Sequence, residues 1–95
     1  MKTGIRLGIF GIAIGLSGCA LPPDGVSQQD IANYEAAVAS IGCVMAHESD
    51  YLPVEFQAGL TREQTLAITK YELAAERAVS LPEGGVKLTT GACAG

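Results

Sequence analysis

Residues 27–48 read SQQDIANYEAAVASIGCVMAHE. Apolar residues recur along this stretch at three- and four-residue spacing, which indicates the buried face of a helix over about residues 28–48. These residues are Ile31, Tyr34, Val38, Ile41 and Met45. A second stripe of small residues on almost the opposite side includes Cys43, and Ser27 with Asp30 resembles an N-terminal capping pair. The stretch therefore predicts a first helix, and its second face indicates either a second packing partner or simply the high helix propensity of alanine.

Three further elements are expected after this helix. Pro53 favours one or two helical turns over residues 53–58, closed by Gly59. The capping box Thr61-Arg-Glu-Gln64 predicts a second main helix that runs to about Arg77. Apolar and polar residues then alternate on both sides of the loop 82–85, a pattern typical of a β-hairpin. We expect an α+β fold: a small single domain with two main helices and a C-terminal β-hairpin.

The composition limits the size of the protein and its partners. Its 95 residues, 48% hydrophobic and 17% charged, fit one small globular domain and exclude a multidomain enzyme or a disordered chain. The formal net charge is −4, and it falls to −6 if residues 1–18, with Lys2 and Arg6, are removed. Because such a surface repels phosphates, no nucleic-acid partner is expected.

The N-terminal residues form a separate unit of the sequence. Two basic residues, Lys2 and Arg6, precede an apolar run of ten residues, 7–16. This run is too short to cross a bilayer, which takes about 20 apolar residues. A short basic region followed by such a run is typical of a secretory signal peptide, here residues 1–18.

The signal ends in Leu16-Ser17-Gly18-Cys19. This tetrapeptide resembles the lipobox of bacterial lipoproteins, with a match at all four positions. The resemblance implies a diacylglyceryl group on the Cys19 thiol, cleavage before Cys19, and acylation of the new amino terminus. The alternative is an ordinary secretory signal with a structural Cys19.

The resemblance also implies a location in the cell envelope. Ala20, not Asp, follows Cys19, which in lipoproteins of bacteria with two membranes implies the periplasmic face of the outer membrane rather than the inner membrane. Residues 19–29 contain Pro22-Pro23 and Asp24-Gly25, which favour an extended stretch and a turn. We therefore expect residues 19–29 to form a lipidated tether, and residues 30–95 to form the α+β domain.

The number of cysteines supports the assignment of lipid to Cys19. Three cysteines in an exported protein leave one unpaired. If Cys19 carries lipid, Cys43 and Cys93 remain as a pair in an oxidising compartment, and we expect a disulfide between them. The alternative is metal binding: Cys43 and His47 are one helical turn apart, and Cys93 is available as a third ligand. No complete metal-ligand motif accompanies them, so no metal or cofactor is predicted.

Nothing in the sequence predicts catalysis. No serine lies in a nucleophile motif, and His47 is the one side chain suited to act as a base at neutral pH. The acidic pairs Glu48/Asp50 and Glu72/Glu76 are interpreted as solvated helix faces. We therefore expect neither an enzyme nor a small-molecule substrate.

The segment 50–56 is the expected contact surface for a partner. It contains Tyr51, Leu52 and Phe56, apolar side chains of the kind that anchor protein interfaces. The same side chains could instead cover the core from one side. Both interpretations stay open at the level of the sequence.

Two functions remain after these exclusions. The first is a membrane-anchored lipoprotein of the cell envelope with a structural or protein-interaction role. The second is an accessory subunit of a membrane complex, possible because residues 48–56, 59–64 and 88–93 are similar to short uncharacterised bacterial proteins, some labelled NADH dehydrogenase subunit. The sequence contains neither a Gly-x-Gly-x-x-Gly turn nor a four-cysteine cluster. A metal-handling protein built on Cys43, His47 and Cys93 is a third, weaker alternative.

Overall fold

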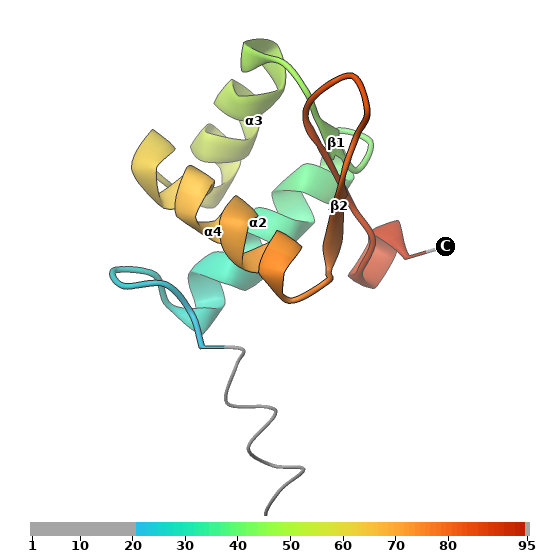
Figure 1. The fold of residues 1–95 in the computed structure, drawn as a ribbon. Helices are drawn as coiled ribbons and strands as arrows, with labels where there is room; N and C mark the ends of the chain where they lie inside the picture. The colour runs from blue at the N-terminus through green and yellow to red at the C-terminus, as the bar shows by residue number, and fades with distance from the viewer. Residues whose placement is uncertain (1–20, 95) are drawn as a thin grey trace, which may run out of the picture.

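The computed structural model describes residues 21–94, which fold into an α+β domain (Figure 1). Three helices pack against one another in this range: α2 (Gln28–Ser40), α3 (Glu48–Ala58) and α4 (Arg62–Ala74). A three-stranded antiparallel sheet lies beside them, composed of β1 (Val44–Met45), β2 (Ala78–Ser80) and β3 (Val86–Leu88). The described chain closes with a short 3-10 helix, η2 (Gly91–Cys93). The predicted fold class is confirmed.

The sheet contains the predicted hairpin and one strand that was not predicted. In the hairpin, Val79 of β2 pairs with Lys87 of β3. On the other edge of β3, Val44 of β1 pairs with the same Lys87, which gives the strand order β1-β3-β2. The third strand matters because an isolated two-stranded hairpin is only marginally stable.

The predicted helix 28–48 is wrong beyond Ser40. The chain leaves the helical conformation at Gly42 and Cys43, whose φ angles are +102° and +70°. The backbone N–H of Cys43 then donates a hydrogen bond to the Val38 carbonyl at 2.9 Å, which closes the end of α2. Met45 is fully buried, as its place in the apolar stripe suggested, but it reaches the core from β1.

Helix α3 is longer than predicted and contains Pro53. It begins at Glu48, where the Asp50 carboxylate accepts hydrogen bonds from the backbone N–H groups of Ala46 (2.8 Å) and His47 (3.0 Å). Pro53 removes one intrahelical hydrogen bond, to the carbonyl of exposed Ser49 in the first turn. The expectation that the helix starts at Pro53 failed because Asp50 caps a helix that begins at Glu48, five residues upstream of Pro53.

The capping box of α4 is confirmed. The Gln64 N–H donates to Thr61 Oγ1, and the Thr61 N–H donates to Gln64 Oε1, both at 3.0 Å. The helix ends at Ala74, not at about Arg77 as predicted. Glu76 has a φ angle of +61°, and this left-handed turn directs the chain into β2.

The core lies where α2, α3, α4 and the sheet meet. Its largest fully buried apolar side chains are Tyr34, Met45, Ile68 and Leu88. The Tyr34 hydroxyl is hydrogen-bonded to the Thr69 hydroxyl at 2.7 Å, which links α2 to α4. Burial raises the pKa of Tyr34 to about 12, so the hydroxyl keeps its proton.

The predicted disulfide between Cys43 and Cys93 is confirmed. The two residues are 50 apart in the sequence, and their Cα atoms are 5.7 Å apart. The bond joins the turn after α2 to η2, and Cys93 itself is buried in the core. It therefore fixes the segment after β3 onto the first helix.

Two neighbouring glycines in the β2–β3 loop give a matched test of this fold. Gly84 and Gly85 both have positive φ angles, but a Cβ on Gly85 would lie 2.6 Å from the Cα of Ala46, whereas a Cβ on Gly84 meets nothing within 4 Å. Gly84→Ala should therefore cost about 1 kcal/mol of unfolding free energy through its φ angle alone. Gly85→Ala adds a clash with the backbone after β1, and should cost about 2–4 kcal/mol in urea denaturation. Equal losses in the two variants would contradict the described packing of this loop.

Candidate functional site

The outer face of α3 carries two apolar side chains in solvent. Leu52 and Phe56 are one turn apart, so they project from the same side of the helix, and 56% and 89% of their surface is exposed. Val54 and Ala58 lie on the buried side of α3. Neither side chain therefore covers the core, which was one of the two interpretations of Leu52 and Phe56 from the sequence.

Tyr51 occupies a different position. Its side chain is half-buried and packs against the core, and the guanidinium of Arg62 lies 4.8 Å from the centre of its ring. Arg62 also forms ion pairs with Glu48, at 2.9 Å between Nη1 and Oε1, and with Glu55. These contacts tie α3 to the start of α4, so the exposed Leu52 and Phe56 stand on a fixed helix.

The residues proposed for metal binding are not available as a site. Cys43 and Cys93 form the disulfide, which removes the two thiolates that such a site requires. Within residues 21–94, no group of three or more His, Cys, Asp or Glu side chains is arranged to hold a metal ion. His47 lies exposed at the start of α3.

A buried acidic cluster was not predicted. Glu72 of α4 is fully buried, and its Oε1 accepts a hydrogen bond from Arg77 Nε at 3.0 Å. Arg77 Nη2 also donates to Glu35 Oε2 of α2 at 2.8 Å, whereas Oε2 of Glu72 has no hydrogen-bond partner among the described residues. The interpretation of Glu72 as a solvated residue is wrong; Glu76 is exposed, as expected.

Burial and charge shift the pKa values of the two carboxyl groups in this cluster in opposite directions. Burial, together with the negative charge of Glu35, raises the pKa of Glu72 to about 8. Burial also acts on Glu35, but hydrogen bonds from Arg77 and its positive charge outweigh it, and the pKa of Glu35 is lowered. One proton on Glu72 therefore leaves the cluster neutral at pH 7, with Glu35 and Arg77 as an ion pair.

This cluster connects α2 to the end of α4, and its position explains why sequence analysis missed it. Glutamate is rarely fully buried without a partner, and its partners Glu35 and Arg77 are supplied by the tertiary fold. The one available signal was spacing. Glu72 follows Thr65, Ile68 and Thr69 on the buried face of α4.

The predicted lipid site, Cys19, and the signal peptide 1–18 lie outside the described residues. Among the residues that the structure describes, no helix has the length and apolar character needed to cross a membrane. Comparisons with protein-family models, curated proteins and solved structures found no match to this chain.

The buried Glu72 predicts a dependence of stability on pH. Because its pKa in the folded state lies above that of an unfolded carboxyl group, its stabilising contribution is complete below about pH 4.5 and is lost as the pH rises through about 8. The unfolding free energy should fall between pH 5 and 8, on the order of 3 kcal/mol. Glu72→Gln should flatten this slope, and Glu76→Gln, at the exposed neighbour, should keep it. Urea denaturation at several pH values measures all three proteins; equal slopes for wild type and Glu72→Gln would contradict the proposed protonation.

Proposed function

We propose that this protein is a membrane-anchored lipoprotein of the bacterial cell envelope with a structural or protein-interaction role. In this proposal, lipid on Cys19 holds the domain at the periplasmic face of the outer membrane. The exposed pair Leu52 and Phe56 on α3 contacts a protein partner. No catalytic step is assigned to the chain.

Two features support the anchor. The first is the tetrapeptide Leu16-Ser17-Gly18-Cys19 directly after a short apolar run, which resembles a lipobox. The second is the Cys43–Cys93 disulfide, since structural disulfides persist in oxidising compartments such as the periplasm. With those two cysteines bonded to each other, Cys19 is the one cysteine left for lipid.

The exposure of Phe56 is the observation that carries the interaction role. The mature chain has four aromatic residues. A small domain needs its few large apolar side chains for its core, yet the side chain of Phe56 is 89% exposed. Leu52 lies beside it on a helix that ion pairs hold in place. Apolar and aromatic side chains on a rigid element are the usual anchors of protein interfaces.

Alanine substitutions separate a contact surface from a structural one. Phe56→Ala should leave the unfolding free energy within about 0.5 kcal/mol of wild type, because the side chain is exposed. The double variant Leu52→Ala/Phe56→Ala should lose its partner when the protein is cross-linked in native membranes, solubilised in detergent and purified. Loss of an interface anchor corresponds to a binding constant weakened about tenfold or more.

Leu66→Ala is the matched control, because Leu66 is an exposed leucine on α4. This variant should retain the partner. A partner recovered equally with all variants would contradict the role of α3. Recovery of a stoichiometric membrane complex through α3 would identify the protein as an accessory subunit of that complex, whereas a single envelope partner would support the stand-alone lipoprotein.

A further inference from the structure

Residues 21–25, called here the N-terminal segment, lie on α4. They were expected to form part of a tether that holds the domain away from the membrane, but Pro22 and Pro23 are half-buried. A hollow of about 420 Å³ lies between the segment and the second half of α4, lined by Leu21, Pro23, Ala67, Lys70, Tyr71 and Ala74. The segment therefore belongs to the folded domain and does not act as a spacer.

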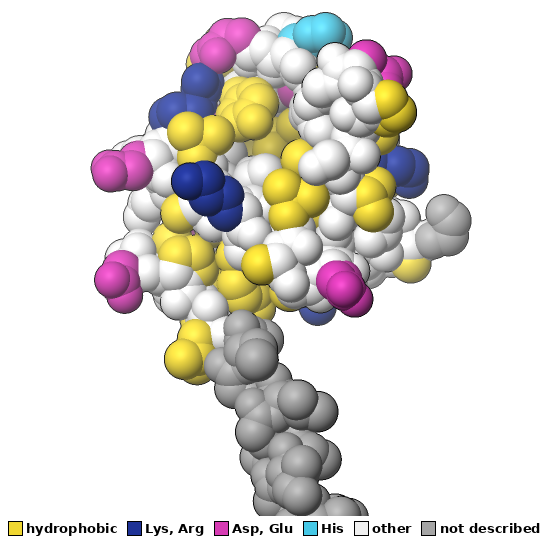
Figure 2. All heavy atoms as spheres, in the orientation of Figure 1, with side chains coloured by type: hydrophobic (Ala, Val, Ile, Leu, Met, Phe, Trp, Pro, Cys, Tyr) yellow, Lys and Arg dark blue, Asp and Glu magenta, His cyan; other side chains and the backbone are white. Residues whose placement is uncertain are grey.

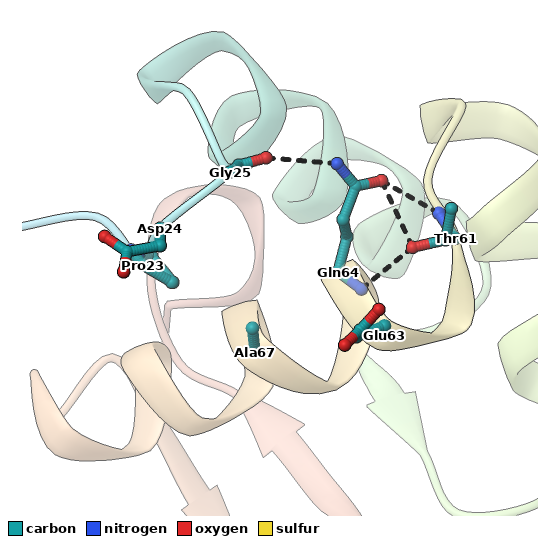
Figure 3. Close-up of a pocket in the computed structure, with 7 residues that line it drawn as sticks. All are labelled: Pro23, Asp24, Gly25, Thr61, Glu63, Gln64 and Ala67. Carbon is teal, nitrogen blue, oxygen red and sulfur yellow. Dashed lines mark hydrogen bonds between the residues drawn. The ribbon is translucent and has the colours of Figure 1, made fainter.

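Hydrogen bonds hold the N-terminal segment in this position. The Val26 N–H donates to the Pro23 carbonyl at 3.2 Å and closes a turn. Gln64 donates from Nε2 to the Gly25 carbonyl at 3.1 Å, while its Oε1 accepts from the Thr61 N–H in the capping box (Figure 3). One side chain thus both caps α4 and fixes the segment across it. Val26 then packs against the core.

The remaining link to the lipid site is very short. Two residue steps separate Cys19 from Leu21, and two fully extended steps span at most about 7 Å. The headgroup layer on each side of a bilayer is about 5–8 Å thick. An acylated Cys19 would therefore place Leu21 within the headgroup layer or directly against it.

The surface around Leu21 has side chains that suit a membrane interface. Leu21 is 74% exposed, and Lys70 and Ala74 are exposed on α4 with half-buried Tyr71 between them. Lysine and tyrosine are typical of the interface, where an ammonium meets phosphates and a ring lies at headgroup level. None of the six residues that line this hollow is acidic, although the mature chain carries a net charge of −6. In the view of Figure 2, a basic side chain lies among hydrophobic ones, and most acidic side chains lie nearer the edge of the molecule.

We propose that the anchor-side surface, formed by Leu21, Lys70, Tyr71 and Ala74, docks on the phospholipid headgroups of the bilayer that holds Cys19. This inference rests on the proposed lipid anchor and adds an orientation to it. The start of α3 lies at the opposite end of the molecule from the N-terminal segment in Figure 1. The docked domain therefore holds the start of α3 away from the bilayer.

Fluorescence quenching tests this orientation directly. The full-length lipidated protein, with one added cysteine at Ala74→Cys or Ser49→Cys, is labelled with a fluorophore and reconstituted in vesicles of phosphatidylethanolamine and phosphatidylglycerol. Part of the lipid carries a nitroxide on its headgroup. Both positions are exposed, on α4 and at the start of α3 respectively. Quenching at position 74 should exceed quenching at position 49 by about threefold or more.

Controls distinguish failure of the orientation from failure of the anchor. Intact mass verifies the acyl groups and the Cys43–Cys93 bond in each sample, and flotation verifies attachment to the vesicles. Equal quenching at both positions in floating, acylated protein would overturn the docked orientation but leave the anchor standing. Protein that carries no acyl groups and does not float would overturn the anchor, and the orientation with it.

A spacer variant tests the short link. Ten Gly and Ser residues inserted between Ala20 and Leu21 add about 17 Å of mean reach. The difference in quenching between positions 74 and 49 should fall to less than half. An unchanged difference would mean that the two-residue link does not set the orientation.

Discussion

The Cys43–Cys93 disulfide is the constraint on which the rest of the domain depends. It joins residues 50 apart. A covalent link across a stretch of that length constrains the unfolded chain and stabilises the folded domain by about 2–4 kcal/mol. A domain of this size rarely obtains more than about 3–5 kcal/mol from its hydrophobic core alone. The bond holds η2 against the end of α2, and all three strands, with β3 in the middle of the sheet, lie in the stretch of chain between the two cysteines. The same bond removes Cys43 and Cys93 from any metal or redox chemistry that needs free thiolates.

Local signals explain which parts of the fold could be predicted from sequence. The capping box at Thr61, the loop 82–85 and the parity of the cysteines each depend on a few neighbouring residues, and each prediction was confirmed. The predictions were wrong where a local sequence pattern conflicted with a contact between distant parts of the chain. The apolar period of the first helix continues to Met45, but the turn at Gly42 and Cys43 is required to bring β1 to β3 and Cys43 to Cys93.

The candidate sites likewise combine features that the sequence could predict with features that only the tertiary fold determines. Leu52 and Phe56 could be chosen from sequence as apolar residues near a proline, but their exposure depends on α3 beginning at Glu48 and burying Val54 on the other side. Glu72 gave little signal, since its burial requires Arg77 and Glu35 from other parts of the chain. The N-terminal segment has the composition of a linker; it packs because Gln64 holds the Gly25 carbonyl.

In the proposed lipoprotein, Cys19 carries lipid, and Cys43 and Cys93 form a disulfide. The most direct test is the intact mass of the protein extracted from its native membranes, before and after thiol alkylation without reductant. The expected mass is that of a chain that begins at Cys19, increased by acyl groups and unchanged by alkylation. A chain without acyl groups would contradict the anchor, and a chain that gains two alkyl groups would contradict the disulfide.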